Sequence, residues 1–147
     1  MSKSRVLFLC TGNSARSQMA EAFLHYYDGE RFEAFSAGLE PQGVNPYTRQ
    51  VMQEKGISLE GHYSKHIKEY MGKVHFDYVV TVCSKAEESC PAVFPKAGAI
   101  LHWSFNDPAA LAGSDEEKLV KFREIRDQIE QRIKDWLQSA GLLAPEG

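Results

Sequence analysis

Residues 10–17 combine a cysteine thiol, a glycine, an arginine and a serine hydroxyl where an apolar run, Val6–Leu9, gives way to a helical pattern. A tight turn into the first turn of a helix directs backbone N–H groups into one concavity, which binds anions. Arg16 adds a planar fork of donors that suits a tetrahedral oxyanion. These positive groups favour the thiolate of Cys10, which is the nucleophilic form, and the Ser17 hydroxyl can donate a hydrogen bond to it. The sequence therefore predicts a nucleophile at the base of an oxyanion cradle formed by Thr11, Gly12, Asn13, Ser14, Ala15 and Arg16.

The alternative for Cys10 is a buried structural cysteine beside a helix that begins with serine. The offsets of Gly12, Arg16 and Ser17 from the cysteine favour the cradle. Gly12 lets the chain bend where a side chain would obstruct, and Asn13 tolerates the left-handed backbone conformation that holds such a loop. A Walker-type nucleotide loop is not supported, because no Gly-Lys-Ser/Thr sequence follows.

Length and composition predict one soluble domain. The chain has 147 residues, is 43% hydrophobic and 25% charged, and carries a net charge of −3. This charge argues against a nucleic-acid or anionic-membrane partner. We find no signal peptide or membrane span, and an odd count of three cysteines does not suit a disulfide framework, so we predict a cytoplasmic protein. We expect one domain over residues 1–147, with 142–147 as a mobile tail.

Short apolar runs alternate with helical patterns along the chain. Such alternation predicts an α/β fold, a single three-layer domain with a parallel sheet and helices on both faces. Four strands are predicted, at Arg5–Leu9, Phe32–Ala37, Tyr78–Val82 and Ala99–Trp103. Helices are predicted at Ser17–Asp28, from an Asn45 cap and Pro46 to Gly56, at Ser64–Gly72, and at Asp115–Ser139 behind a Ser114–Glu117 capping box.

Three reactive side chains follow predicted strands. Cys10 follows the first strand, Cys83 the third, and Asp107 lies a few residues after the fourth. Ligands of open parallel sheets bind beyond the carboxyl ends of the strands, so we expect these residues to meet at one edge. For Asp107, position alone favours an ordinary Asp-Pro turn.

The segment between Cys83 and Cys90 predicts a short helix. Ser84 and Glu87 match a capping box, and Pro91 ends the pattern. Two helical turns separate the cysteines by about 10.5 Å, whereas a disulfide needs Cα atoms within about 7 Å. The two cysteines can therefore pair only if this marginal helix unwinds. The alternative is two unrelated core cysteines.

The Cys-x5-Arg-Ser pattern near the N-terminus, followed much later by Asp107-Pro108, resembles the low-molecular-weight protein tyrosine phosphatase family over nearly the whole chain. Within that family, residues 10–14 with Cys83 and Cys90 resemble the thioredoxin-coupled arsenate reductases. The resemblance implies a four-stranded parallel sheet, with Cys10 as nucleophile, Arg16 as oxyanion binder and Asp107 as general acid.

The residues after Asp107 favour a small substrate. Phosphatases of this family carry aromatic residues there, which wall a slot for a phenyl ring, whereas this chain has Ala109 and Ala110. The segment 41–44, expected to overhang the site, also lacks an aromatic residue. An inorganic anion such as arsenate loses nothing from that absence, and we expect phosphate or sulfate to mimic it.

The resemblance also implies a three-cysteine relay. Cys10 attacks arsenate, Cys83 attacks Cys10 and releases arsenite, and Cys90 moves the disulfide to Cys83–Cys90, which thioredoxin reduces. The alternatives are a phosphomonoester phosphatase and a non-enzymatic oxyanion or thiol-redox sensor.

We predict neither a metal nor a cofactor. No Cys-x2–4-Cys pair accompanies the isolated His102, so a zinc site is not supported, and the other histidines are interpreted as ordinary residues. Some thioredoxin-coupled reductases bind potassium through counterparts of Asn13, Glu21 and Ser36 plus an acidic residue. Here the fourth position is Lys65, whose ammonium could replace the ion or lie on the surface.

Overall fold

Four parallel strands form the sheet of the computed structural model, which describes residues 3–70, 72–83, 98–110 and 112–139. The strands are β1 (Ser4–Cys10), β2 (Phe32–Gly38), β3 (Tyr78–Thr81) and β4 (Ala99–His102). Their order is β2-β1-β3-β4, which makes β1 and β3 central neighbours. Each observed strand lies within one residue of its predicted boundaries at either end, and the predicted four-stranded parallel sheet is confirmed.

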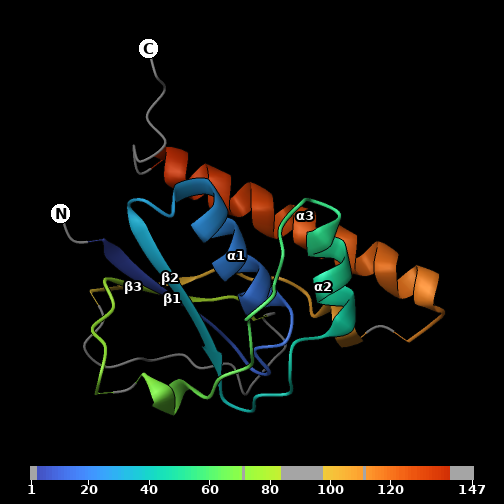
Figure 1. Ribbon diagram of the computed structural model, residues 1–147, viewed down its shortest axis with the longest axis horizontal. Helices are drawn as coiled ribbons and strands as arrows, with labels where there is room; N and C mark the ends of the chain where they lie inside the picture. Colours follow the sequence, from blue (N-terminus) through green and yellow to red (C-terminus); the bar gives the residue numbers. More distant parts are fainter. Residues whose placement is uncertain (1–2, 71, 84–97, 111, 140–147) are drawn as a thin grey trace.

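Within the described residues, three α-helices pack on one face of this sheet. They are α1 (Arg16–Asp28), α2 (Pro46–Gln53) and α3 (Asp115–Ser139), and Figure 1 shows α1 lying beside both β2 and α3. Alternate β1 side chains, Val6 and Phe8, enter this main core. The helices contribute to it Met19, Phe23, Leu24, Val51, Met52, Phe122, Ile125, Ile129 and Ile133.

A smaller core covers the opposite face. It contains Leu7 and Leu9 from β1 with Ile67 and Phe76, and Tyr70 packs edge-on against Phe76 with ring centroids 5.7 Å apart. The 3₁₀ helix η1 (Ile67–Glu69) lies on this side, so the prediction of helical cover on both faces is met there by a 3₁₀ helix. The predicted Ser84–Cys90 helix lies outside the described residues.

Local capping explains why the predictions for α2 and α3 are accurate. Asn45 accepts a hydrogen bond from the Tyr47 backbone N–H at 2.8 Å, and α3 opens with the predicted reciprocal bonds between Ser114 and Glu117, at 3.0 and 3.2 Å. Regular α2 ends at Gln53, and the chain then turns through Gly56 at φ 76°. Left-handed glycine just past a helix is the usual way to satisfy its last carbonyls.

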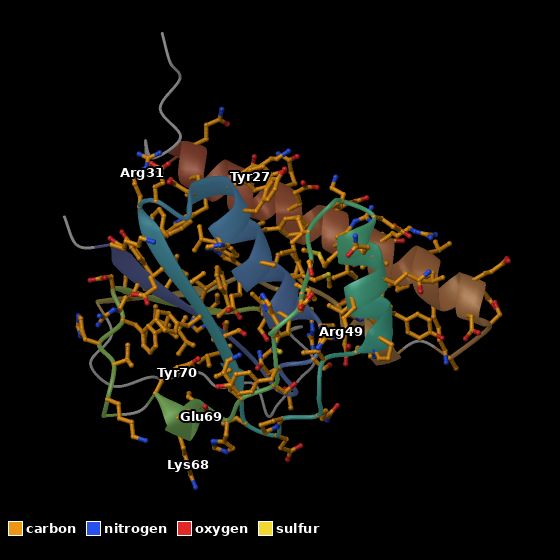
Figure 2. All side chains as sticks on the ribbon, viewed as in Figure 1. Tyr27, Arg31, Arg49, Lys68, Glu69 and Tyr70 are labelled. Atoms are coloured by element: carbon orange, nitrogen blue, oxygen red, sulfur yellow. The ribbon has the colours of Figure 1, made fainter. Side chains whose placement is uncertain are left out.

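The predicted Ser64–Gly72 helix is much shorter than expected. Of the residues described in this segment, only Ile67–Glu69 is helical, with 3₁₀ geometry, because the His66 ring caps the Lys68 N–H at 3.0 Å and the chain has turned by Gly72, at φ 75°. Figure 2 shows Lys68 pointing away from the protein while Tyr70 lies against it. A single turn suffices here because its role is to bury Ile67 and Tyr70.

Glu54 links α2 to α3, and its loss is the first testable prediction. Its carboxylate accepts hydrogen bonds from Arg123 at 2.7 Å and Arg126 at 2.8 Å. The Arg123 bond, opposed by partial burial and reinforced by Arg126, holds the pKa of Glu54 below its ordinary value of 4.5. We expect Glu54→Gln to lower the free energy of unfolding by about 1 kcal/mol at neutral pH.

The pH dependence has a definite sign. A lowered carboxylate pKa stabilises the fold above the unfolded value, and this contribution is lost as the pH falls through the folded value. The stability difference between parent and Glu54→Gln should therefore disappear in acid. Urea unfolding at several pH values measures it, with Glu60→Gln, an exposed carboxylate, as the control. A difference that stays constant from neutral to acidic pH would contradict the assignment.

Candidate functional site

Cys10 is held at the point where β1 turns into α1. Its Sγ lies 2.9 Å from Ser17 Oγ and accepts the Asn13 backbone N–H at 3.2 Å. Cys10 is 2% exposed and is a free thiol. Ala15 is the N-cap of α1 and makes no side-chain capping bond, so no side chain competes there with an anion for the first N–H groups of the helix. The structure therefore confirms the predicted strand–turn–helix setting of Cys10.

Asn13 braces this turn in the left-handed conformation that the sequence predicts. Its φ is 48°, its Nδ2 donates to Ser17 Oγ at 2.7 Å, and its Oδ1 accepts the Lys65 N–H at 2.9 Å. Ser64 Oγ also donates to the Asn13 carbonyl, at 2.6 Å. A segment about fifty residues downstream therefore fixes the loop in place.

A close backbone approach at Gly38 also holds the loop. A Cβ on Gly38 would lie 2.6 Å from the Thr11 carbonyl oxygen and 2.9 Å from that of Cys10. Sequence reasoning did not identify Gly38, because a requirement for glycine at the end of a strand becomes visible only when the neighbouring loop is in place.

Arg16 and Asp107 lie side by side in the lining of a cavity of about 410 Å³. Arg16 is 4% exposed, donates to the Phe105 carbonyl at 3.1 Å, and has Nη2 3.7 Å from Asp107 Oδ2. The other Asp107 oxygen accepts the Ala109 N–H at 2.9 Å, which caps the short 3₁₀ helix η2 (Pro108–Ala110). Asp107 is thus a turn residue and a wall of the cavity at once.

The side chains that line the cavity are either small or polar. Its lining residues are Cys10, Thr11, Gly12, Ser14, Ala15, Arg16, Gln42, Asn106, Asp107, Ala109 and Ala110. These lining residues include no aromatic side chain, in agreement with the segments 41–44 and 109–110. The carboxamides of Gln42 and Asn106 were not predicted as site residues. Gln42 is held there by its N–H, which donates to the Gly12 carbonyl at 3.0 Å.

Cys83 lies at the same sheet edge as Cys10. β1 and β3 pair with Leu9 opposite Thr81, and the Val82 N–H extends the ladder to the Leu9 carbonyl at 2.9 Å. Both cysteines belong to the main core on the α-helical face, and Cys83 is 5% exposed. Cys83 is disulfide-bonded, whereas Cys10 is free. Cys90 lies outside the described residues.

Lys65 is buried beside the loop. Its Nζ donates to the Tyr63 carbonyl at 2.7 Å and lies 4.5 Å from the centre of the Tyr63 ring. Burial lowers the pKa of Lys65, and the charges of Glu21 and Glu69 oppose this. Glu21 accepts a hydrogen bond from Ser36. A lysine that is 6% exposed and attracted by Glu21 is not a plain surface residue, which favours the first of the two interpretations of Lys65.

Within the ranges that the structure describes, no three His, Cys, Asp or Glu side chains converge as metal ligands would. None of the helices in those ranges has the length and apolar character needed to traverse a bilayer.

Substituting Gly38 is expected to damage the cradle without unfolding the sheet. In Gly38→Ala the new methyl group must push the carbonyls of Thr11 and Cys10 aside, and displacements of this kind cost up to about a hundredfold in binding or rate. We expect phosphate to protect Cys10 from alkylation only at concentrations at least about tenfold higher than for the parent. Thermal unfolding separates this local effect from loss of the fold, and unchanged protection would refute it.

Comparisons with known proteins agree with this geometry. The chain is 44% identical over 140 residues to an arsenate reductase of Halalkalibacterium halodurans, covering 95% of this chain and 99% of that protein. It is 39% identical over 139 residues to an arsenate reductase of Bacillus subtilis, with the same coverage. Among solved structures, a thioredoxin-dependent arsenate reductase of Corynebacterium glutamicum superposes with a TM-score of 0.69 at 29% identity, over 95% of this chain and 63% of that one. An arsenate reductase in an oxidised state superposes with a TM-score of 0.75 at 27% identity, over 92% of this chain and 98% of that one.

The family match covers almost the whole chain. The sequence profile described as "Low molecular weight phosphotyrosine protein phosphatase" matches residues 5–142. The chain therefore belongs to the low molecular weight phosphotyrosine protein phosphatase family, as the Cys10–Ser17 segment and Asp107-Pro108 predict.

Proposed function

We propose that this protein is an arsenate reductase that works through a relay of Cys10, Cys83 and Cys90. The observation that carries the proposal is the position of two cysteines on neighbouring strands. Cys10 ends β1 and lines the anion cavity, whereas Cys83 follows the neighbouring strand β3. Both belong to the main core, so the proposed nucleophile and a second sulfur lie at the same edge of the sheet. Close relatives over nearly the full length are arsenate reductases, which supports the choice of substrate.

The first step forms a bond between sulfur and arsenic. The Cys10 thiolate attacks the arsenic(V) centre while Arg16 and the N–H groups of the cradle bind the remaining oxygens. One oxygen departs as water after Asp107 supplies a proton to it. Asp107 lines the cavity with Arg16 at 3.7 Å, so acid and oxyanion binder reach the same ligand.

The second step reduces arsenic. Cys83 attacks the Cys10 sulfur, a sulfur–sulfur bond forms, and the sulfur–arsenic bond breaks with its electron pair moving to arsenic. Arsenic(V) becomes arsenic(III), which leaves as arsenite after protonation. Cys90 then attacks Cys83 and expels the Cys10 thiolate, which leaves a Cys83–Cys90 disulfide. A free Cys10 together with a disulfide-bonded Cys83 in this structure supports this order of steps.

The cavity wall favours an inorganic anion over a phosphotyrosine ring. At positions where a bound aromatic ring would need large apolar side chains around it, the cavity is lined by Ala109, Ala110 and Gln42. Burying an aromatic ring is worth about 1.5–3 kcal/mol, which this wall does not supply. Phosphate fits the same donors but cannot accept the electron pair, so a phosphate adduct would only be hydrolysed.

Thioredoxin is the proposed reductant of the final disulfide, and the description of the Corynebacterium glutamicum relative as a thioredoxin-dependent arsenate reductase supports this choice. A relay that must return three thiols to the reduced state suits the cytoplasm.

Thioredoxin-dependent consumption of NADPH tests the proposal. With thioredoxin and its reductase present, arsenate is expected to drive continuous oxidation, and phosphate is the matched control that binds without accepting electrons. No turnover by well-folded protein would reject the reductase. Efficient hydrolysis of phosphotyrosine peptides that persists without Cys83 would favour the phosphatase. Stoichiometric oxidation without turnover would favour a thiol sensor.

A further inference from the structure

We propose that Gln18 and His62 are positioning residues for the Cys10 thiolate, at the far end of a hydrogen-bond chain that runs through Asn13 and Ser17. The proposal rests on Cys10 being the nucleophile of the proposed function. It concerns two residues that do not line the anion cavity: Gln18 on α1 and His62 in the segment that follows α2.

The Asn13 end of the chain has a fixed polarity. The Lys65 backbone N–H can only donate, so the Asn13 atom that it meets at 2.9 Å is the carbonyl oxygen Oδ1. Asn13 Nδ2 therefore donates to Ser17 Oγ, at 2.7 Å. With that acceptor position filled, the Ser17 hydrogen is directed to the Cys10 sulfur, 2.9 Å away.

Gln18 is the next residue of the hydrogen-bond chain, and its partners fix the orientation of its carboxamide in the same way. Its Nε2 faces three acceptors, the Asn13 carbonyl at 3.2 Å, Asn13 Oδ1 at 3.1 Å and the Tyr63 carbonyl at 3.0 Å. The carboxamide oxygen Oε1 must then face His62 Nδ1, at 3.2 Å, and this nitrogen must carry a hydrogen. Gln18 is fully buried, so no solvent can replace the histidine as donor without entering the loop.

Every link therefore donates toward sulfur. His62 donates to Gln18, Gln18 to Asn13, Asn13 to Ser17 and Ser17 to Cys10. Hydrogen bonds aligned in this way polarise one another, so the first donor strengthens the last bond. Removing His62 also takes away the hydrogen bond that it donates to the buried carboxamide oxygen of Gln18, and it allows the Gln18 side chain to turn away from Asn13.

The surroundings of His62 favour its neutral form with hydrogen on Nδ1. Burial lowers the pKa of His62, and Lys65, Arg49 and His25 add to this, whereas Glu21 opposes it. Arg49, which extends from α2 (Figure 2), holds the segment by donating to the Leu59 carbonyl at 2.8 Å and to the His62 carbonyl at 3.1 Å. Protonation of His62 would keep the Nδ1 hydrogen, so the role is to position rather than to switch with pH.

The rate of Cys10 alkylation by iodoacetamide tests the chain without arsenate. In a parent with Cys83 and Cys90 replaced by serine, His62→Leu is expected to slow alkylation at neutral pH by about threefold to tenfold. His62→Asn places an amide donor near the position of Nδ1 and should restore the rate to within about twofold. His25→Leu is the control, because His25 borders the same surface cavity as His62 but takes no part in the chain.

A double-mutant cycle separates the chain from simple packing. If the signal passes from His62 through Gln18, Gln18→Met alone should be at least as slow as His62→Leu, and the double variant no slower than Gln18→Met. Equal alkylation rates in His62→Leu and the parent, failure of His62→Asn to restore the rate in folded protein, or additive losses would each overturn the proposal. Because alkylation needs neither arsenate nor thioredoxin, these outcomes are independent of whether the protein reduces arsenate.

Discussion

Replacing Cys83 by serine is expected to abolish the reduction of arsenate completely while leaving Cys10 chemically competent. Without the second sulfur, nothing can attack the Cys10–arsenate adduct and move its electron pair to arsenic, so no arsenite forms. Cys83 lies beyond the anion cavity lining, so phosphate should still protect Cys10 from alkylation as in the parent. Arsenite quantified after mixing reduced protein with arsenate measures the effect.

Cys90→Ser provides the matched comparison. In that variant the first two steps remain possible, so each protein molecule should yield one arsenite and stop as a Cys10–Cys83 disulfide. We expect both variants to hydrolyse phosphomonoesters weakly, because this reaction would need Cys10 and Arg16 but neither Cys83 nor Cys90. Sustained thioredoxin-coupled turnover in either variant would show that the relay is assigned wrongly.

The second large effect is expected for Arg16→Lys. Arg16 is buried at the cavity wall, braced by the Phe105 carbonyl at 3.1 Å and facing Asp107. A lysine keeps the charge but loses the planar fork that can hold two oxygens of a tetrahedral anion. Loss of one such donor from a preorganised oxyanion site costs about 100- to 1000-fold, and we expect a decrease of this size in kcat/KM for arsenate.

Arg31→Lys is the control for that substitution. Arg31 is exposed, lies beyond the C-terminal end of α1 and pairs with Asp28 at 3.0 Å (Figure 2), so its replacement should leave kcat/KM unchanged. A loss below about threefold in Arg16→Lys would mean that the backbone N–H groups, rather than the guanidinium, carry anion binding.

Local signals explain what could be predicted from the sequence. The bounds of α3 follow from the Ser114–Glu117 capping box and a stripe of apolar residues, both of which are properties of adjacent turns. The meeting of Cys10, Arg16 and Asp107 follows from the rule that parallel strands gather their carboxyl ends. Both inferences need only sequence order and the geometry of regular elements.

The features that were not predicted depend on contacts between segments that are far apart in the sequence. Gly38 looks like an ordinary strand residue until the Thr11 carbonyl lies against it. Gln18 and His62 are separated by more than forty residues, and neither is part of a recognisable sequence motif. The Ser64–Gly72 segment has helical composition. Because Ile67 and Tyr70 pack into the smaller core, however, its described residues form one turn of 3₁₀ helix rather than an α-helix.

Disulfide mapping after a single turnover tests the central claim most directly. Fully reduced protein is mixed with one equivalent of arsenate without thioredoxin, the remaining thiols are alkylated, and the peptides are identified by mass spectrometry. The relay predicts one equivalent of arsenite, an alkylated Cys10 and a disulfide joining Cys83 to Cys90. Arsenite released while all three cysteines are alkylated, or no arsenite from folded protein, would contradict it.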